Sequence, residues 1–257
     1  MAQPKAGSEQ VFSHIILTRF NVRWITDEPP GTEWLRHRFQ LFDRFCYPSV
    51  YGQTNQNFKW LVFFDQYTPS EFVERIEVYA KWENFIPVYL RHFDTSLVRE
   101  RLAAFSEDSS HLITTRLDND DAICKDFVHT VQLNFRHQDF EFINFTYGFV
   151  WNNHNVYLSR QKSNPFISLI ESVHKYRTVW CENHVTLSSL GSIKQLVTQP
   201  AWLQVIHKWN VCNEIQGLLQ PSTDLNERFS INPIGLESET AHGGNSELAI
   251  LPKSIST

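Results

Sequence analysis

The sequence predicts an α/β fold with a mostly parallel central sheet flanked by helices, and two observations support this prediction. Short apolar, β-branched runs alternate with segments of helical periodicity over the first half of the chain. Several of these runs end in polar or acidic residues, as strands do where open α/β sheets bind ligands. Strands that alternate with helices form parallel sheets covered on both faces, so we expect buried strands and helices on each side.

The predicted elements of the first half follow one another in order. Residues 14–18 form a buried strand that delivers Arg19 and Asn21 at its carboxyl end. Residues 34–46 have the spacing of a helix, and Pro48 follows its expected end. The remaining elements are a strand over 58–65 that ends in Asp65, a helix from about Ser70 to Tyr79, an edge strand over 84–90 with Pro87, a helix over 97–105, and a strand over 111–117.

The second half of the chain changes character. A helix is expected over 125–135, and the odd positions from 143 to 151 alternate as in one half-buried strand. Further short strands are expected near 155–160 and 166–170, and helices over 192–197 and 202–210, with Pro200 between them. We expect one folded domain over residues 10–220. The polar, aperiodic segment 221–257 is expected to be a loosely packed or disordered tail.

Composition restricts the classes of function. The formal net charge of −5 over 257 residues provides no overall basic field, so nucleic acid is not an expected partner. The four cysteines form no C-x-x-C pair, which argues against a zinc ribbon or a disulfide framework and favours a cytoplasmic location. Residues 1–10 lack a signal-peptide core, and no apolar run reaches the roughly 18 residues of a membrane span. Peripheral membrane association stays open.

The strongest chemical signal is the segment Asp118-Asn119-Asp120-Asp121. Closely spaced carboxylates at the end of a buried strand are costly unless a cation or solvent compensates them. Magnesium and manganese prefer oxygen ligands, and magnesium commonly takes one or two carboxylates and completes its shell with water and phosphate. The segment therefore predicts a Mn²⁺ or Mg²⁺ site that bridges to a diphosphate. The alternative is an acidic turn that caps the following helix.

Residues 116–121, Arg-Leu-Asp-Asn-Asp-Asp, resemble the Asp-x-Asp segment of GT-A glycosyltransferases. Together with residues 14–21, 60–65 and 202–210, they make the chain similar to the rhamnosyltransferase family of bacteria and phages over residues 12–213. The resemblance implies a GT-A-like fold, a nucleotide-sugar donor, and a glycan or other hydroxyl acceptor.

The resemblance also implies roles for individual residues. It places ribose and metal contacts on Asp118 and Asp120, and a later metal-ligating histidine on His207. A histidine packed between Trp202 and Trp209 is the alternative for His207.

Further donor contacts are expected from residues at the other predicted strand ends. Arg19, Asn21 and Asp65 are suited to a base, ribose or phosphate, although Arg19 could equally serve in a structural ion pair. Arg116 would offset diphosphate charge, and a surface role is its alternative. Asn119 and Asn210 complete the predicted donor-binding set.

An inverting transfer needs a base for the acceptor hydroxyl, and Glu182 is the candidate because it lies among apolar residues. His184 and Asp139 are its rivals, and a surface role is the alternative for Glu182.

Two other functions compete with metal-dependent sugar transfer. A sugar-phosphate nucleotidyltransferase would carry a glycine-rich loop after its first strand, whereas residues 19–24 contain no glycine. A non-catalytic carbohydrate-binding module could use the eight tryptophans for stacking but would not need the acidic segment.

Overall fold

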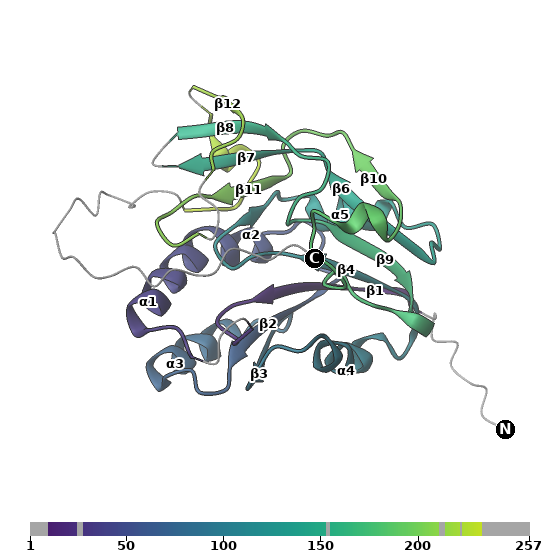
Figure 1. The fold of residues 1–257 in the computed structure, drawn as a ribbon, viewed down its shortest axis with the longest axis horizontal. Helices are drawn as coiled ribbons and strands as arrows, with labels where there is room; N and C mark the ends of the chain where they lie inside the picture. The colour runs from purple at the N-terminus through teal and green to yellow at the C-terminus, as the bar shows by residue number, and fades with distance from the viewer. Residues whose placement is uncertain (1–9, 25–27, 153–154, 211–213, 222, 233–257) are drawn as a thin grey trace.

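The protein is built around two β-sheets, seen in the computed structural model of Figure 1. The structure describes residues 10–24, 28–152, 155–210, 214–221 and 223–232. In these ranges the larger sheet has the strand order β10-β6-β9-β4-β1-β2-β3, and the smaller sheet has the order β12-β8-β7-β11-β5. Within the same ranges, no helix has the length and apolar character needed to span a membrane.

The larger sheet is parallel at its centre and mixed at one side. Its parallel strands are β1 (Gln10–Arg19), β2 (Lys59–Asp65), β3 (Phe85–Leu90) and β4 (Ser109–Arg116). Strand β9 (Ser168–Ser172) runs antiparallel to both β4 and β6 (Phe140–Phe145), and β10 (Ile193–Leu196) runs parallel to β6. The predicted α/β class with a mostly parallel central sheet is confirmed, and β3 with its proline lies at an edge.

Both faces of this sheet are buried at its centre, which explains why β2 is a nearly continuous apolar run. In β2, Trp60, Val62 and Phe64 face one core, whereas Leu61 and Phe63 face the other. Because neighbouring side chains of a strand point to opposite faces, a strand buried on both sides is mostly apolar. The buried polar side chains of β1 and β4 find hydrogen-bond partners, as His14 and Thr115 do with each other at 2.8 Å.

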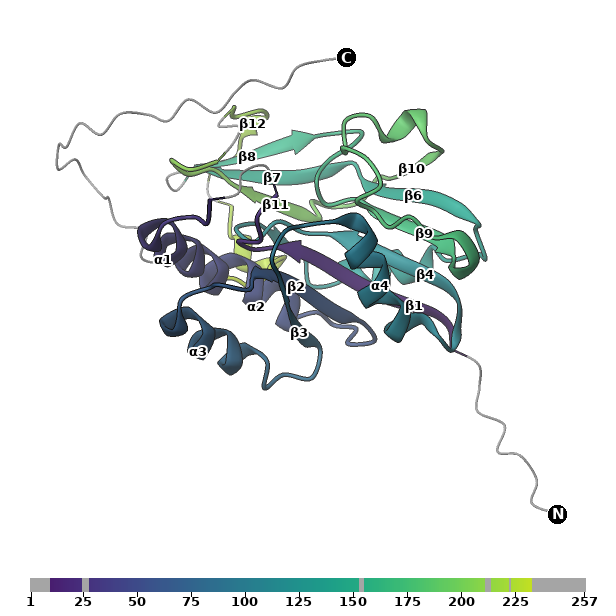
Figure 2. The ribbon, with the colours of Figure 1, turned by 60° about the horizontal axis from the view of Figure 1, so that its bottom comes forward.

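Helices and the smaller sheet cover the two faces. The first core contains residues of α1 (Thr32–Leu41), the π-helical turn Phe42–Cys46, α2 (Tyr47–Tyr51), α3 (Ser70–Tyr79), α5 (Phe127–Leu133) and the smaller sheet. The second core contains residues of α4 (Thr95–Ser106), which lies across β1 in Figure 2. Short 3₁₀ turns span Val173–Lys175, Leu187–Ser189 and Leu225–Glu227.

The smaller sheet contains segments from distant parts of the chain. Its strands are β5 (Ala122–Ile123), β7 (Tyr147–Asn152), β8 (Asn155–Arg160), β11 (Trp202–Val205) and β12 (Leu218–Leu219). Gly148 of β7 lies against the buried indole of Trp202, where an added Cβ would come within 1.9 Å of the ring. Close contact between β7 and the Trp202 ring therefore requires glycine at this position.

Four sequence predictions were wrong in detail. The expected helices over 192–197 and 202–210 are instead strands β10 and β11, the second followed by a loop. The expected single strand over 143–151 is two strands, because the chain leaves the larger sheet after β6 and enters the smaller one at β7. Pro48 does not end the helical segment but lies in the first turn of α2, where proline is tolerated.

A further difference concerns the expected tail. Leu225, Phe229 and Ile231 are buried in the first core, so the described residues 223–232 pack against the domain. The main-chain N–H of Lys125 donates to the carbonyl of Arg228 at 2.9 Å, which joins this segment to the residues after β5. Residues 233–257 lie outside the described part of the chain.

Candidate functional site

The acidic segment connects the two sheets. It follows β4 of the larger sheet and continues directly into β5 of the smaller sheet. Strand β5 pairs with β11, with Trp202 opposite Ile123 and Leu203 opposite Ala122. Because β11 ends at Val205, the residues that follow it lie beside the acidic segment. This pairing explains how Asp120 and His207 meet although they are 87 positions apart.

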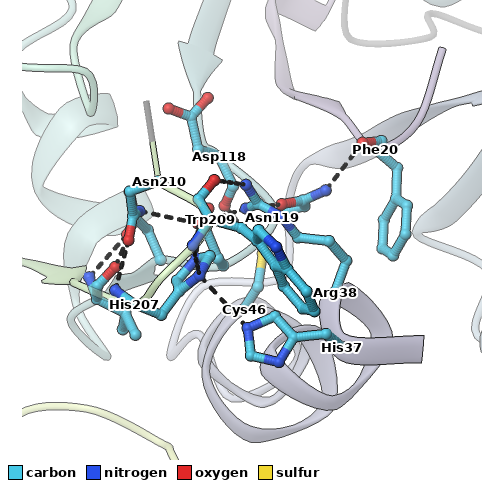
Figure 3. A network of polar contacts seen from close by, with 12 residues as sticks. Phe20, His37, Arg38, Cys46, Asp118, Asn119, His207, Trp209 and Asn210 are labelled. Carbon is cyan, nitrogen blue, oxygen red and sulfur yellow. Dashed lines mark hydrogen bonds and ion pairs between the residues drawn. The ribbon is translucent and has the colours of Figure 1, made fainter. Parts of the chain in front are cut away.

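Asp120 is the centre of the site. Its Oδ2 lies 2.8 Å from His207 Nε2 and accepts a bond from Asn210 Nδ2 at 3.4 Å. The same oxygen forms an ion pair with Arg38 of α1, whose Nη1 also donates to Asn119 Oδ1 at 3.0 Å. Figure 3 shows this network, in which Arg38 lies between Asn119 and the loop that carries Trp209. Three separate parts of the chain therefore meet at one carboxylate.

Burial and neighbouring charges shift the pKa values of Asp120 and Asp121 in opposite directions. Burial acts to raise the pKa of Asp120, but Arg38 and His207 lower it below its usual value. Burial and the neighbouring carboxylates of Asp120 and Asp118 raise the pKa of Asp121 well above its usual value. Asp121 Oδ1 accepts the main-chain N–H of Val205 at 2.9 Å, so this side chain attaches the acidic loop to the end of β11.

Asp118 is the most exposed of the three carboxylates and pairs with Arg116. Arg116 Nη2 lies 2.9 Å from Asp118 Oδ2, where the Asp118 side chain is 36% exposed. Burial acts to lower the pKa of Arg116, but Asp118 raises it above its usual value. On its other side, Arg116 Nη1 lies 3.3 Å from His184 Nδ1. Burial, with the adjacent Arg116, lowers the pKa of His184 to about 4, so this imidazole is neutral at pH 7.

Arg19 lies at the end of β1 and stacks on aromatic rings. Its guanidinium carbon is 3.8 Å from the ring centre of Trp24 and 5.6 Å from that of Trp180. Burial lowers the pKa of Arg19 to about 10, which still leaves it charged at pH 7. Arg19 and Arg116 thus place two cations at neighbouring strand ends, beside Asp118.

Three of the predicted donor-binding residues hydrogen-bond to other protein groups at the ends of the strands. Asn21 Oδ1 accepts the main-chain N–H of Asp65 at 3.1 Å, and Asp65 Oδ2 accepts from Arg23 Nε at 2.6 Å. Asn119 Nδ2 donates to the Phe20 carbonyl at 3.0 Å, while its oxygen accepts from Arg38. All three side chains are buried. In this structure these side chains hydrogen-bond to protein groups and so fix the strand ends, and their contacts with a donor stay a prediction.

The candidate bases lie in different places. Glu182 is exposed, and its Oε1 accepts the main-chain N–H of Asn183 at 2.8 Å. It stands between Trp180 and His184, which contact the two strand-end arginines. Asp139, by contrast, lies at the beginning of β6, where its carbonyl accepts the Ser172 N–H at 3.1 Å. Since β6 runs in the same direction as β4, Asp139 lies at the opposite edge of the sheet from Asp118 and Asp120, and the structure does not bring it to the other site residues.

The chemistry of Asp120 and His207 suits one divalent cation. Carboxylate oxygen and imidazole nitrogen are both metal ligands, and two ligand atoms at about 2.1 Å from one ion lie roughly 3 Å apart when they are at right angles. The observed separation of 2.8 Å is that of a hydrogen bond, and it places both ligand atoms within reach of one ion. Among the described residues, no group of three or more His, Cys, Asp or Glu side chains could hold an ion. The remaining ligands would have to be phosphate and water.

Sequence reasoning missed Arg38, together with His37 and Trp209. His37 Nε2 lies 3.3 Å from His207 Nδ1, and its ring packs edge-on against Trp209 with centroids 4.5 Å apart. A signal for Arg38 was present: it lies three residues after Leu35 and four before Phe42, both buried, on the apolar side of the helix. A charged residue at such a position requires a buried partner.

Carboxylates and arginines at the carboxyl ends of parallel strands are typical of α/β proteins that bind phosphorylated ligands. Residues 31–218 match the family described as "Putative rhamnosyl transferase". The chain therefore belongs to this family of glycosyltransferases, which confirms the resemblance noted in the sequence. The mixed, mostly parallel sheet agrees with the GT-A-like fold that the resemblance implied.

Solved structures give distant similarities. A fragment of S. aureus TarS in complex with UDP has a TM-score of 0.47 and 12% identity over 77% of this chain and 61% of that one. A protein from Desulfovibrio desulfuricans G20 described as a "putative nucleotide-diphospho-sugar transferase" has a TM-score of 0.41. It is 10% identical over 75% of this chain and 80% of that one. The chain thus spans less than two thirds of the TarS fragment. A search of curated proteins finds no match.

Proposed function

We propose that the protein transfers a sugar from a nucleotide-sugar donor to a hydroxyl group of a glycan or other acceptor, with Mn²⁺ or Mg²⁺ bound at Asp120 and His207. The observation that carries the proposal is the contact of Asp120 Oδ2 with His207 Nε2 at 2.8 Å, formed between the two sheets and next to arginines. Family membership supports the same reaction class.

The side chains of the site have complementary roles in this proposal. Arg116 and Arg19 offset the charge of the donor diphosphate, because guanidinium groups bind phosphate oxygens in a planar, two-bonded geometry. Asp118 is exposed enough to accept a ribose hydroxyl or to contact the cation. Asn210 positions His207, since it accepts the His207 main-chain N–H and donates to the Val205 carbonyl. When bound, the cation supplies positive charge against the diphosphate leaving group.

The comparisons suggest candidate donors, and a screen of nucleotide sugars would test them. Rhamnose comes from the family description, whereas TarS structures contain UDP or UDP-GlcNAc. Hydrolysis and transfer with several nucleotide sugars, each with Mn²⁺ and with a chelator, would identify base and sugar together. Turnover of none of them would contradict the proposed reaction.

The shared cation is tested by a double-mutant cycle on Asp120→Asn and His207→Gln. These substitutions retain hydrogen-bonding capacity at two buried positions and so limit structural damage. Calorimetric titration of UDP with and without Mn²⁺ should show weaker metal-dependent binding in each variant. The double variant should lose less binding free energy than the sum of the two single losses, because the second substitution acts on a metal site that the first has already disrupted. Strict additivity, or unchanged metal dependence in His207→Gln, would remove His207 from the site.

The same titrations separate the two competing functions. A carbohydrate-binding module would bind sugars whether or not Mn²⁺ is present. A nucleotidyltransferase would release pyrophosphate from a nucleoside triphosphate and a sugar phosphate, whereas the proposed enzyme would release a nucleoside diphosphate.

A further inference from the structure

Arg38 is held inside the candidate site by contacts to two loops. Its side chain is 11% exposed and that of Asp120 6% exposed where they form their ion pair. Besides Asp120 and Asn119, Arg38 contacts the Trp209 carbonyl through Nη2 at 3.5 Å. Figure 3 shows the side chain reaching from its helix toward Asn119 and Trp209. The guanidinium therefore connects the acidic loop to the loop that carries His207.

The Asp120 oxygen that would bind a cation is already surrounded by donors. Oδ2 is approached by Arg38, by His207 Nε2 at 2.8 Å and by Asn210 Nδ2 at 3.4 Å. A carboxylate oxygen offers about two lone-pair positions, so these donors leave none on Oδ2 for an ion. His207 can become a ligand by presenting a ring nitrogen, but the permanently charged guanidinium cannot. Arg38 would have to leave before a divalent cation could bind at Oδ2 next to His207.

The position of Arg38 also has an unsatisfied group. Within the described part of the chain, its Nε is fully buried and has no hydrogen-bond partner. A buried donor without a partner is unfavourable, so the resting position of this guanidinium is a compromise. A diphosphate at the same strand ends would offer it new acceptors.

We propose that Arg38 is the resident counter-cation of Asp120, and that it keeps the site closed to a divalent cation until the guanidinium moves away. The inference rests on the proposed metal site at Asp120 and His207 and extends it. It predicts that the pair of ligands binds a free ion weakly, because Arg38 repels the ion and occupies the Oδ2 atom of Asp120. The entering cation takes over the charge that Arg38 had balanced.

The test is the affinity for Mn²⁺ alone, measured by the loss of the free-ion EPR signal without any nucleotide. Arg38→Gln should bind Mn²⁺ at least about tenfold more tightly than the parent protein does. The substitution removes a repelling unit charge a few ångströms from the ion in a poorly solvated site. Arg38→Lys retains the charge and should stay within about threefold of the parent. Arg36→Gln removes one charge from the same helix at an exposed position and should also stay close to the parent.

A second measurement, thermal unfolding with and without Mn²⁺, tests the inference even if Arg38→Gln folds poorly. Arg38→Gln leaves a buried carboxylate without its cation, so Mn²⁺ should raise its melting temperature, or restore its folding, more than it stabilises the parent. Potassium at equal ionic strength should not do so. Unchanged or weaker Mn²⁺ affinity in Arg38→Gln, or equal tightening in Arg36→Gln, would overturn the inference. These readouts need no nucleotide, so a failed donor screen would contradict the proposed function without deciding this point.

Discussion

Replacing Phe229 tests whether the segment after β12 belongs to the folded domain. Its ring is 0% exposed and packs near Phe149, with ring centroids 6.4 Å apart. Truncation of a fully buried Phe to Ala lowers the free energy of unfolding by about 3–5 kcal/mol, through lost burial and the cavity left behind. In a chain of this size, each kcal/mol changes the melting temperature by about 2–4 °C. Phe229→Ala should therefore melt roughly 6–20 °C below the parent.

The assay is thermal unfolding followed by circular dichroism, with Leu218→Ala as the matched control. Leu218 is 73% exposed, so its truncation should change the melting temperature by less than about 2 °C. Removal of residues 222–257 should destabilise the protein more than Phe229→Ala, since it also removes Leu225 and Ile231. A fall of less than about 3 °C for Phe229→Ala would refute the view that this segment completes the core.

Three other predictions concern charge, catalysis and packing. Burial raises the pKa of Glu171 from 4.5 to about 7. The contribution of Glu171 to the free energy of unfolding should therefore be complete below about pH 4.5 and be lost as the pH rises through about 7, a decline of roughly 3 kcal/mol at most. Denaturant titrations of Glu171→Gln at several pH values should lack this decline. Glu182→Gln should slow sugar transfer about 100-fold while sparing donor binding, and activity within a few-fold of the parent would assign the base elsewhere. Gly148→Ala should displace the Trp202 ring and lower the unfolding free energy by about 1–3 kcal/mol in denaturant titrations, an effect that a paired Trp202→Phe change should reduce.

The central strands and the acidic loop could be predicted from sequence because their signals are local. The runs over 14–18, 58–65 and 111–117 are rich in apolar and β-branched residues at consecutive positions, and burial on both faces of a sheet favours this pattern. Asp118 and Asp120 follow such a run directly, so their place at a strand end needed no knowledge of the remaining chain.

The remaining features depend on partners far along the chain. Trp202, Val205, Ile206 and Trp209 have helical spacing, yet pairing with β7 and β5 makes the first part of this segment a strand. Non-local pairing overrides a local periodicity that fits either structure. Arg38 was missed for the same reason, since its partner Asp120 lies on another element. The inward-facing Asn21 and Asp65 likewise depend on contacts that sequence spacing does not reveal.

The pairing of β5 with β11 has a consequence for the order in which the protein folds. It is a short pairing of Trp202 with Ile123 and Leu203 with Ala122, between segments about 80 positions apart, so a large loop must close before it can form. The larger sheet can assemble its parallel centre from earlier residues, whereas the meeting of Asp120 and His207 must await the docking of β11. The amide of Val205, which donates to Asp121, is thus a natural hydrogen-exchange reporter of site assembly. A protein that opened locally here would retain most of its secondary structure while losing the contact of Asp120 with His207.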